Sequence, residues 1–166
     1  YSVWRRGKPV IKPSSLGFIL KNQPPLAWNW KIASSKNRHY DNTWTQPWGE
    51  KKEIHNHYHE LIVLLVEKTE KARKMKLIFR LFDDGFGFRY QIPQQEHLKQ
   101  FAIMDELTEF VLTSDHKTWF IPAFKPNRYE YLYQNKPVSQ LNIVHTPVTM
   151  ESMDGLFISI HEAALT

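Results

Sequence analysis

The sequence predicts an all-β fold in which antiparallel sheets pack as a sandwich, and three observations lead to this prediction. Residues 54–66 alternate polar and apolar side chains and then become continuously apolar, as in a strand that passes from a half-exposed to a buried position. Residues 75–93 show the same pattern on both sides of Asp83, Asp84 and Gly85, a turn signal that predicts an antiparallel hairpin. Ten prolines divide the chain and exclude long helices across these segments.

The remaining elements follow from the same patterns. The basic run at residues 67–76 includes two glutamates and falls between two apolar segments, so we interpret it as a solvated hairpin loop. Further strands are expected within residues 101–121 and 156–160, and a short helical turn is expected at residues 105–109. The final residues, HEAALT, break off without a turn or cap, and we therefore expect the domain to continue beyond Thr166.

Composition and charge limit the classes of protein to which this chain can belong. It has 166 residues, of which 42% are hydrophobic, and this suits one globular domain. The formal net charge of +5 would suit a nucleic-acid partner, but the basic residues are scattered and form no phosphate-binding patch. The absence of cysteine excludes disulfides and thiolate metal sites, and no apolar run of about 18 residues predicts a membrane helix.

Three histidines alternate along one strand-like segment. His55, His57 and His59 should lie on one face of a sheet, with imidazoles about 6–7 Å apart along the strand. Neighbouring histidines of this kind can share a zinc ion with a third ligand from elsewhere. The same pattern also suits an ordinary polar sheet face, so both interpretations remain open.

Two pairs of carboxylates lie close together in the sequence and are candidates for acid–base chemistry. Asp83 and Asp84 form the tip of the predicted hairpin, where a turn is the simpler interpretation. Glu50 and Glu53 lie beside Trp48 at a strand entrance, and their spacing fixes no catalytic separation. We therefore assign no catalytic residue to this chain.

Aromatic side chains can present flat faces to sugar rings, although core packing is an alternative use. The candidates for sugar stacking are Trp44, Trp48, Trp119 and Phe120. Arg80 and Arg89 lie on the two arms of the predicted hairpin. For both arginines we expect pairing with a buried carboxylate or a backbone carbonyl rather than contact with a substrate.

Four motifs together resemble one known family. The most specific are PWGEKKEIHNHYHEL at residues 47–61 and RLFDDGFGFRYQIPQQ at residues 80–95, and they are accompanied by GKPVIKPSSLGF at residues 7–18 and DGLFISIHEAAL at residues 154–165. In these segments the chain resembles the amino-terminal domain of glycoside hydrolase family 97, the α-glucosidases and α-galactosidases of gut and marine bacteria. The resemblance implies a β-super-sandwich like that of galactose mutarotase, with residues 1–166 forming most of one domain. It also implies a catalytic (β/α)8 barrel outside this sequence.

The resemblance assigns a role to Glu130, which lies in the segment IPAFKPNRYEYLY at residues 121–133. A carboxylate carried by a loop can serve as an oxygen ligand for a hard cation. In the family, a glutamate of an E-Y-x-Y segment joins glutamates of the barrel in binding calcium at the active site, and Glu130 with Tyr131 and Tyr133 matches that segment. Glu162, in the last motif, is expected to serve packing or an interdomain contact.

The implied activity is that of a calcium-dependent, exo-acting α-glycosidase. An α-glucosidase is expected first and an α-galactosidase second, acting on an α-linked oligosaccharide in the periplasm or another exported location. Because the catalytic residues would lie in the barrel, we expect this chain alone to be inactive and to bind calcium weakly. A free-standing carbohydrate-binding module is the alternative from another class, whereas a nucleic-acid partner and a membrane span are not expected.

Overall fold

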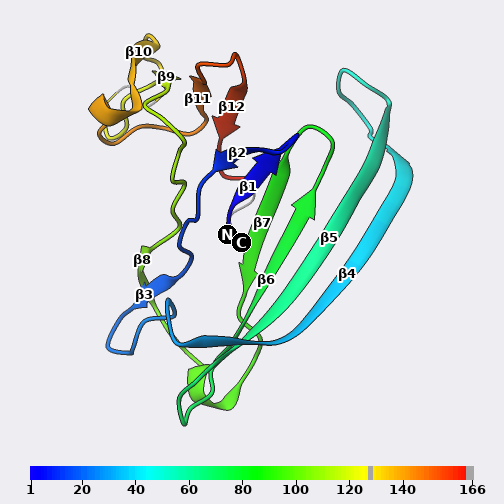
Figure 1. The fold of residues 1–166 in the computed structure, drawn as a ribbon, viewed down its shortest axis with the longest axis vertical. Coiled ribbons are helices and arrows are strands. Elements are labelled where there is room, and N and C mark those ends of the chain that lie inside the picture. Colours follow the sequence, from blue (N-terminus) through cyan, green and yellow to red (C-terminus); the bar gives the residue numbers. More distant parts are fainter. Residues whose placement is uncertain (127–128, 164–166) are drawn as a thin grey trace. The chain divides into compact units, whose positions relative to one another are not determined.

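The computed structural model describes residues 1–126 and 129–163, and the regular structure in this part of the chain is almost entirely β-strand (Figure 1). All strand pairings are antiparallel, so the predicted all-β fold of antiparallel sheets is confirmed. The elements are β1 (Val3–Arg5), β2 (Lys8–Ile11), β3 (Phe18–Leu20), β4 (Trp30–Thr45), β5 (Glu53–Glu67), β6 (Lys74–Leu81), β7 (Phe86–Gln91), β8 (Ile103–Glu106), β9 (Lys117–Phe120), β10 (Gln134–Pro137), β11 (Val148–Glu151) and β12 (Phe157–Ile160), with short 3-10 turns η1 (Glu96–Leu98) and η2 (Val138–Gln140).

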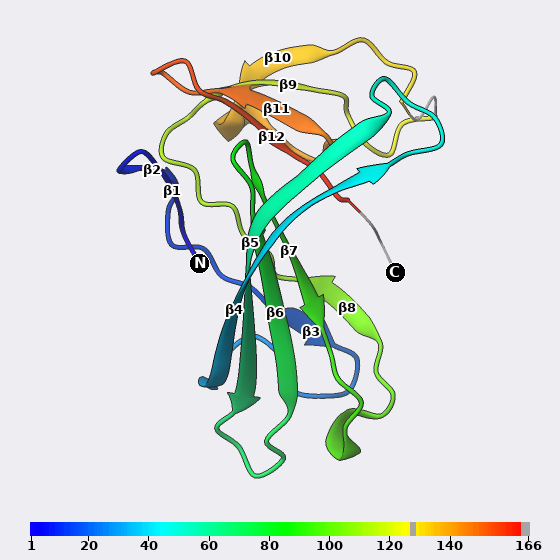
Figure 2. The same cartoon turned by 90° about the vertical axis from the view of Figure 1, so that its right-hand side faces the viewer.

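The chain forms two compact units. One consists of residues 16–108, and the other combines residues 1–15 with the chain from residue 109 onward. In the unit of residues 16–108, the four strands β4-β5-β6-β7 form a meander in which each strand pairs with its neighbour in sequence (Figure 2). The shorter pair β3-β8 belongs to the same unit.

Apolar side chains from these two sheets form the core of the unit. The apolar end of β5 pairs with β6, and this places buried side chains on one face of the meander, where β3 and η1 contribute theirs. The buried cluster consists of Phe18, Leu20, Leu26, Leu65, Met75, Leu77 and Leu98. The predicted strands at residues 54–66 and 75–93, and the turn at Asp83–Gly85, are therefore confirmed.

One local prediction is wrong, and a second holds only in part. Residues 103–106 form β8 rather than part of a helical turn, because Asp105 and Glu106 pair with Ile19 and Phe18 of β3. The hairpin connection predicted within residues 67–76 joins β5 to β6, but it is only partly solvated, since Glu67 and Arg73 are 5% and 3% exposed. An ion pair between these two residues explains their burial.

The unit that contains both ends of the sequence has a short hairpin and a four-stranded sheet. β1 and β2 are joined by Arg6 and Gly7, which both have positive φ, as type I′ hairpin turns require. The sheet has the order β10-β9-β11-β12. The predicted strand at residues 156–160 is confirmed as β12, whereas residues 101–121 contain two separate strands, β8 and β9. No helix in the described part of the chain is long and apolar enough to cross a membrane.

Candidate functional site

Glu130 lies in the loop of residues 121–133, hereafter the Glu130 loop, which connects β9 to β10. These two strands pair directly, with Phe120 opposite Gln134, so both ends of the loop are fixed by the sheet. The first part of the loop is also held by residues 143–145. The Ala123 amide donates to the Ile143 carbonyl at 3.1 Å, and the His145 amide donates to the Ile121 carbonyl at 2.9 Å.

The Glu130 side chain is exposed and makes no hydrogen bond or ion pair with any described residue. Its neighbour Tyr129 packs on the ring of His145, with centroids 4.3 Å apart. The following residues Leu132 and Tyr133 are 89% and 62% exposed. The loop therefore presents a carboxylate and apolar side chains to its surroundings.

A calcium ion fits Glu130 only as one of several ligand groups. Calcium takes six to eight oxygen ligands, and one carboxylate supplies at most two of them. In residues 1–126 and 129–163, no group of three or more histidine or acidic side chains is arranged to hold a metal ion. The chemistry of Glu130 thus suits calcium, but the remaining oxygens would have to come from elsewhere.

The three histidines of β5 lie on one sheet face, as predicted. The ring centroids of His55 and His57 are 5.9 Å apart, and those of His57 and His59 are 6.2 Å apart. The sequence did not reveal that β4 adds His39 to the same face, where its Nε2 atom is 3.1 Å from Nε2 of His57. We call these four residues the histidine face.

Acidic side chains border the histidine face. The His55 imidazole, 2.7 Å from Asp41 Oδ1, lowers the pKa of the Asp41 carboxyl below its usual value. Asp83 Oδ2 is 3.7 Å from Nδ1 of His57. Asp83 can therefore interact with His57. It also belongs to the turn in which the Phe82 amide donates to the Gly85 carbonyl.

The other carboxylates form no catalytic pair in the described residues. Glu50 is exposed in the connection between β4 and β5, and Glu53 is the exposed first residue of β5. Glu60, which sequence reasoning did not single out, is 5% exposed and accepts a hydrogen bond from Nε of Arg80 at 3.0 Å. The pairing predicted for Arg80 is confirmed, but Arg89 is exposed and makes no such pair with the described residues.

The four candidate aromatics differ in their accessibility. Trp48 and Trp44 are 85% and 48% exposed and can meet a ligand. Trp119 is half-buried, and Nζ of Lys117 lies 4.9 Å from its ring centroid. Phe120 is buried, so the proposal of sugar stacking is wrong for this residue: core packing occupies its ring. Glu162 is exposed and does not serve packing within the described chain, while an interdomain role stays a prediction.

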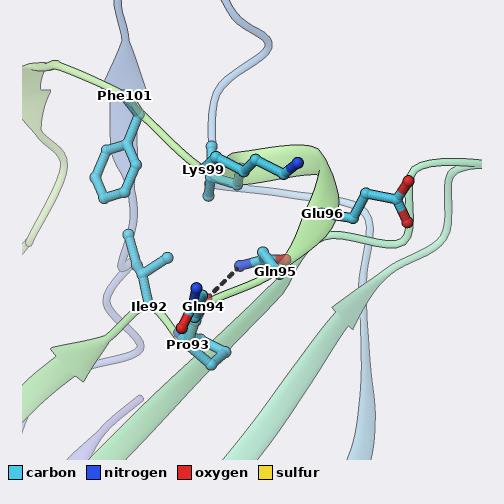
Figure 3. A pocket seen from close by; sticks show the side chains of 8 residues that line it. Ile92, Pro93, Gln94, Gln95, Glu96, Lys99 and Phe101 are labelled. Atoms are coloured by element: carbon cyan, nitrogen blue, oxygen red, sulfur yellow. Dashed lines mark hydrogen bonds between the residues drawn. The ribbon is translucent and has the colours of Figure 1, made fainter.

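A groove of about 660 Å³ lies beside η1 and contains none of the predicted site residues (Figure 3). Ile92, Leu98 and Phe101 supply its apolar surface, and Glu96 and Lys99 are its charged residues. Gln95 is engaged by the backbone: its amide group exchanges hydrogen bonds of 2.7 and 2.9 Å with Lys74. The groove therefore offers few free polar groups to orient a ligand.

Comparison with known proteins places this architecture in a family. The family model described as "Glycosyl-hydrolase 97 N-terminal" matches residues 1–166. Solved structures of a glycoside hydrolase family 97 enzyme from Pseudoalteromonas sp. strain K8, in complex with panose and in complex with acarbose, are each 38% identical to this chain with a TM-score of 0.95. Each match covers 99% of this chain and 25% of the solved chain. A β-arabinopyranosidase, 22% identical over 99% of this chain and 28% of its own, has a TM-score of 0.84 and shares the fold.

Proposed function

Because this chain belongs to the glycosyl-hydrolase 97 N-terminal family, we propose that it is the amino-terminal β-sandwich of a calcium-dependent α-glycosidase whose catalytic barrel lies outside these residues. The enzyme acts on the non-reducing end of an α-linked oligosaccharide in the periplasm or another exported location. An α-glucosidase is the first assignment, and an α-galactosidase is the second. The panose and acarbose complexes of the Pseudoalteromonas enzyme support a saccharide substrate.

This proposal rests on the exposure of the Glu130 carboxylate and on its lack of a partner among the described residues. Its carboxylate is exposed on a loop whose ends are fixed by β9 and β10, and no described residue occupies it. A carboxylate in this setting is available to a ligand from outside the described chain. We propose that Glu130 supplies one oxygen ligand group to the calcium ion and that other parts of the enzyme supply the rest.

In this arrangement the chain positions the site and does not transfer protons. The bound calcium ion supplies positive charge that helps to hold a substrate or an acidic group in place. The paired strands β9 and β10 fix the loop that carries Glu130, and the exposed side chains of Leu132 and Tyr133 offer apolar area for contact with the catalytic part. The chain alone is then inactive and binds calcium weakly.

The test uses the complete natural protein, with aryl α-glucoside and aryl α-galactoside as substrates, in calcium or in chelator. We expect calcium-dependent hydrolysis of one of the two sugars and a loss of that activity in Glu130→Gln. Glu70→Gln is the matched control, because Glu70 is also an exposed loop glutamate with no partner among the described residues. Full activity of Glu130→Gln in chelator would show that Glu130 is not a calcium ligand and that hydrolysis does not require calcium.

A carbohydrate-binding module is the second candidate, and the exposure of Trp48 favours it. In that case the 166-residue chain would bind maltooligosaccharide without a barrel, and Trp48→Ala would abolish the change in tryptophan fluorescence. An unchanged fluorescence signal on titration of the wild-type chain would remove this candidate.

A further inference from the structure

A second recess, of about 340 Å³, lies beside β10 in the unit that contains both ends of the sequence. We call it the β10 recess. Four segments line it: the end of β9 at Phe120, residues 122–125 of the Glu130 loop, β10, and residues 140–144. Its volume suits a small ligand. Glu130 does not line it, so the proposed calcium chemistry makes no use of this recess.

Backbone contacts hold the walls of the β10 recess in place. Pro122 and Val144 form an isolated β-bridge, and the hydrogen bonds already described between the Glu130 loop and residues 143–145 lie on either side of it. The chain before residue 142 is fixed by η2, where the Leu141 amide donates to the Val138 carbonyl at 2.9 Å. The recess is therefore formed by the fold and does not depend on a ligand to assemble it.

The register of β9 and β10 brings an apolar floor and polar side chains together. Gln134 is opposite Phe120 in this ladder, and Lys136 lies two residues further along β10. Cross-strand partners and alternate residues of one strand point to the same face of a sheet, so these three side chains share a face. Phe120 is 5% exposed and packs in the core, whereas Gln134 and Lys136 are exposed.

Five polar side chains line the β10 recess, and the described protein engages none of them. All five are exposed, and their side chains make no hydrogen bond or ion pair with any described residue. They are three amides and two ammonium groups, from Gln134, Gln140, Asn142, Lys125 and Lys136. No acidic side chain occurs among the described residues that line the recess. The recess therefore combines free hydrogen-bonding groups with uncompensated positive charge.

Phe124 lines the recess in a backbone conformation that is unfavourable for a bulky side chain. Its φ is +55°, in the left-handed region, which costs free energy for residues other than glycine. Its side chain is 88% exposed, so burial of the ring does not offset this cost. Backbone strain of this kind is concentrated at ligand sites, where it holds a side chain in a useful position. The strain thus provides independent support for a ligand-binding role of the recess.

The groups of the β10 recess indicate the chemistry of its ligand. A primary amide both donates and accepts hydrogen bonds, and this suits the hydroxyl groups of a sugar. An exposed aromatic ring suits the apolar face of a sugar ring. Ammonium groups without an acidic neighbour attract an anionic substituent. A neutral sugar would leave both ammonium groups without a counter-charge, and a simple anion would make no use of the amides or the phenyl ring.

We propose that the β10 recess binds a sugar acid, that is, one saccharide unit that carries a carboxylate. The two lysines bind the carboxylate, the three amides bind hydroxyl groups, and Phe124 covers one face of the sugar ring. The enzyme then has a site for acidic saccharide units in addition to the site at which it hydrolyses its substrate. This inference does not rest on the calcium role proposed for Glu130, because the two use different residues.

The test is a titration of the complete natural protein with sodium glucuronate, followed by ligand-observed saturation-transfer NMR. Chelator is present throughout, so a carboxylate bound to calcium cannot contribute and the result holds whether or not Glu130 binds calcium. We expect saturable binding. Glucose and sodium acetate, added as competitors at constant ionic strength, should each need at least about tenfold higher concentration to displace glucuronate, because each lacks one of the two kinds of contact.

Variants locate the binding in the β10 recess. Lys125→Gln and Lys136→Gln should each weaken glucuronate binding by about 3–10-fold, as expected for one charge-assisted hydrogen bond at an open site. Phe124→Gly should also weaken binding but should melt at or above the wild-type temperature, because glycine adopts positive φ without strain. Lys36→Gln is the matched control, since Lys36 is an exposed strand lysine on β4 and its replacement removes the same charge.

Lys36→Gln should bind glucuronate as the wild type does, and thermal unfolding in chelator checks that every variant folds. The proposal is overturned if the wild type shows no saturable glucuronate binding, or if glucose or acetate displaces glucuronate at an equal concentration. It is also overturned if both recess lysine variants bind as tightly as Lys36→Gln, or if Phe124→Gly keeps the wild-type affinity.

Discussion

Arg73 and Glu67 form a two-pronged ion pair beneath the β5–β6 loop, with Nε to Oε2 at 2.6 Å and Nη2 to Oε1 at 2.5 Å. The guanidinium also donates to the carbonyls of Pro24 and Pro25 at 2.8 and 3.0 Å. All three nitrogens of the side chain are therefore engaged, and this fork geometry cannot be reproduced by a lysine. The pair ties the loop to the segment that precedes β4.

Removal of either partner should destabilise the protein strongly. Glu67→Gln or Arg73→Met leaves a buried charge without its partner, and the expected loss in free energy of unfolding is about 3–5 kcal/mol. The measurement is urea unfolding followed by circular dichroism. Glu70→Gln, in the same loop but exposed, should change stability by less than about 0.5 kcal/mol. Equal losses in Glu67→Gln and Glu70→Gln would show that the buried ion pair contributes no more to the free energy of unfolding than an exposed glutamate does.

Arg80 and Arg89 should differ in the same experiment, although both lie on arms of one hairpin. Arg80 donates to the buried carboxylate of Glu60, and its guanidinium carbon lies 4.7 Å from the centroid of the Tyr58 ring. Arg80→Met leaves Glu60 with only Arg38, at 3.7 Å, and should cost about 1–3 kcal/mol. Arg89→Met should stay within about 0.5 kcal/mol. A larger loss for Arg89→Met than for Arg80→Met would contradict this assignment.

The elements that could be predicted from the sequence are those whose burial imposes a pattern. β5, β6 and β7 bury alternate or consecutive apolar residues, and this periodicity located them. β4 has no such pattern: Trp30 and Tyr40 are partly buried and the other residues from Trp30 to Thr45 are exposed. Its strand conformation comes from pairing along β5, which a local reading of the sequence does not detect.

The residues of the candidate sites also differ in whether a local sequence pattern could predict them. His55, His57 and His59 follow from period-2 alternation within one strand, so their common face was predictable. His39 joins them through the register of β4 against β5, and register depends on contacts between distant segments. Glu130 was located by its motif alone, because an exposed loop glutamate carries no periodic signal.

Gly17 should be the least replaceable glycine of the unit formed by residues 16–108. It has φ of +153°, and a Cβ there would lie 2.6 Å from the Leu26 carbonyl oxygen and 2.7 Å from the Ala27 Cα. Both contacts are with backbone, so relief requires movement of the chain beside β3. Gly17→Ala should therefore cost about 1–3 kcal/mol of unfolding free energy.

Gly85→Ala is the control for this prediction. Its Cβ would meet nothing within 4 Å, and its φ is not in the positive range. Thermal unfolding of both variants makes the comparison. The prediction is contradicted if Gly17→Ala has the same melting temperature as the wild type, or if Gly85→Ala loses as much stability. Either result would mean that the close backbone approach at Gly17 does not restrict this position to glycine.

Asp115 should make stability depend on pH through its contact with η2. The Ser139 amide donates to Asp115 Oδ1 at 2.8 Å and the Ser139 hydroxyl donates to Oδ2 at 2.7 Å. Both hydrogen bonds lower the pKa of the Asp115 carboxyl below its usual value, and the bond from the Ser139 amide has the larger effect. The unfolded chain then binds a proton at higher pH than the folded chain. The contribution to stability is present above the unfolded pKa, about 3.9, and is lost as pH falls through the folded value.

The measurement compares the free energy of unfolding of the wild type and Asp115→Asn from neutral to acidic pH. We expect the wild type to be more stable at neutral pH and the difference to shrink as pH falls below about 3.9, because protonation removes the same charge that the substitution removes. Ser139→Ala deletes the hydroxyl donor but keeps the amide donor, so it should reduce the pH-dependent part without abolishing it. Since other carboxylates titrate in the same range, only the difference between variants isolates Asp115. A difference that stays constant with pH would mean that the Ser139 contact does not favour the charged carboxylate.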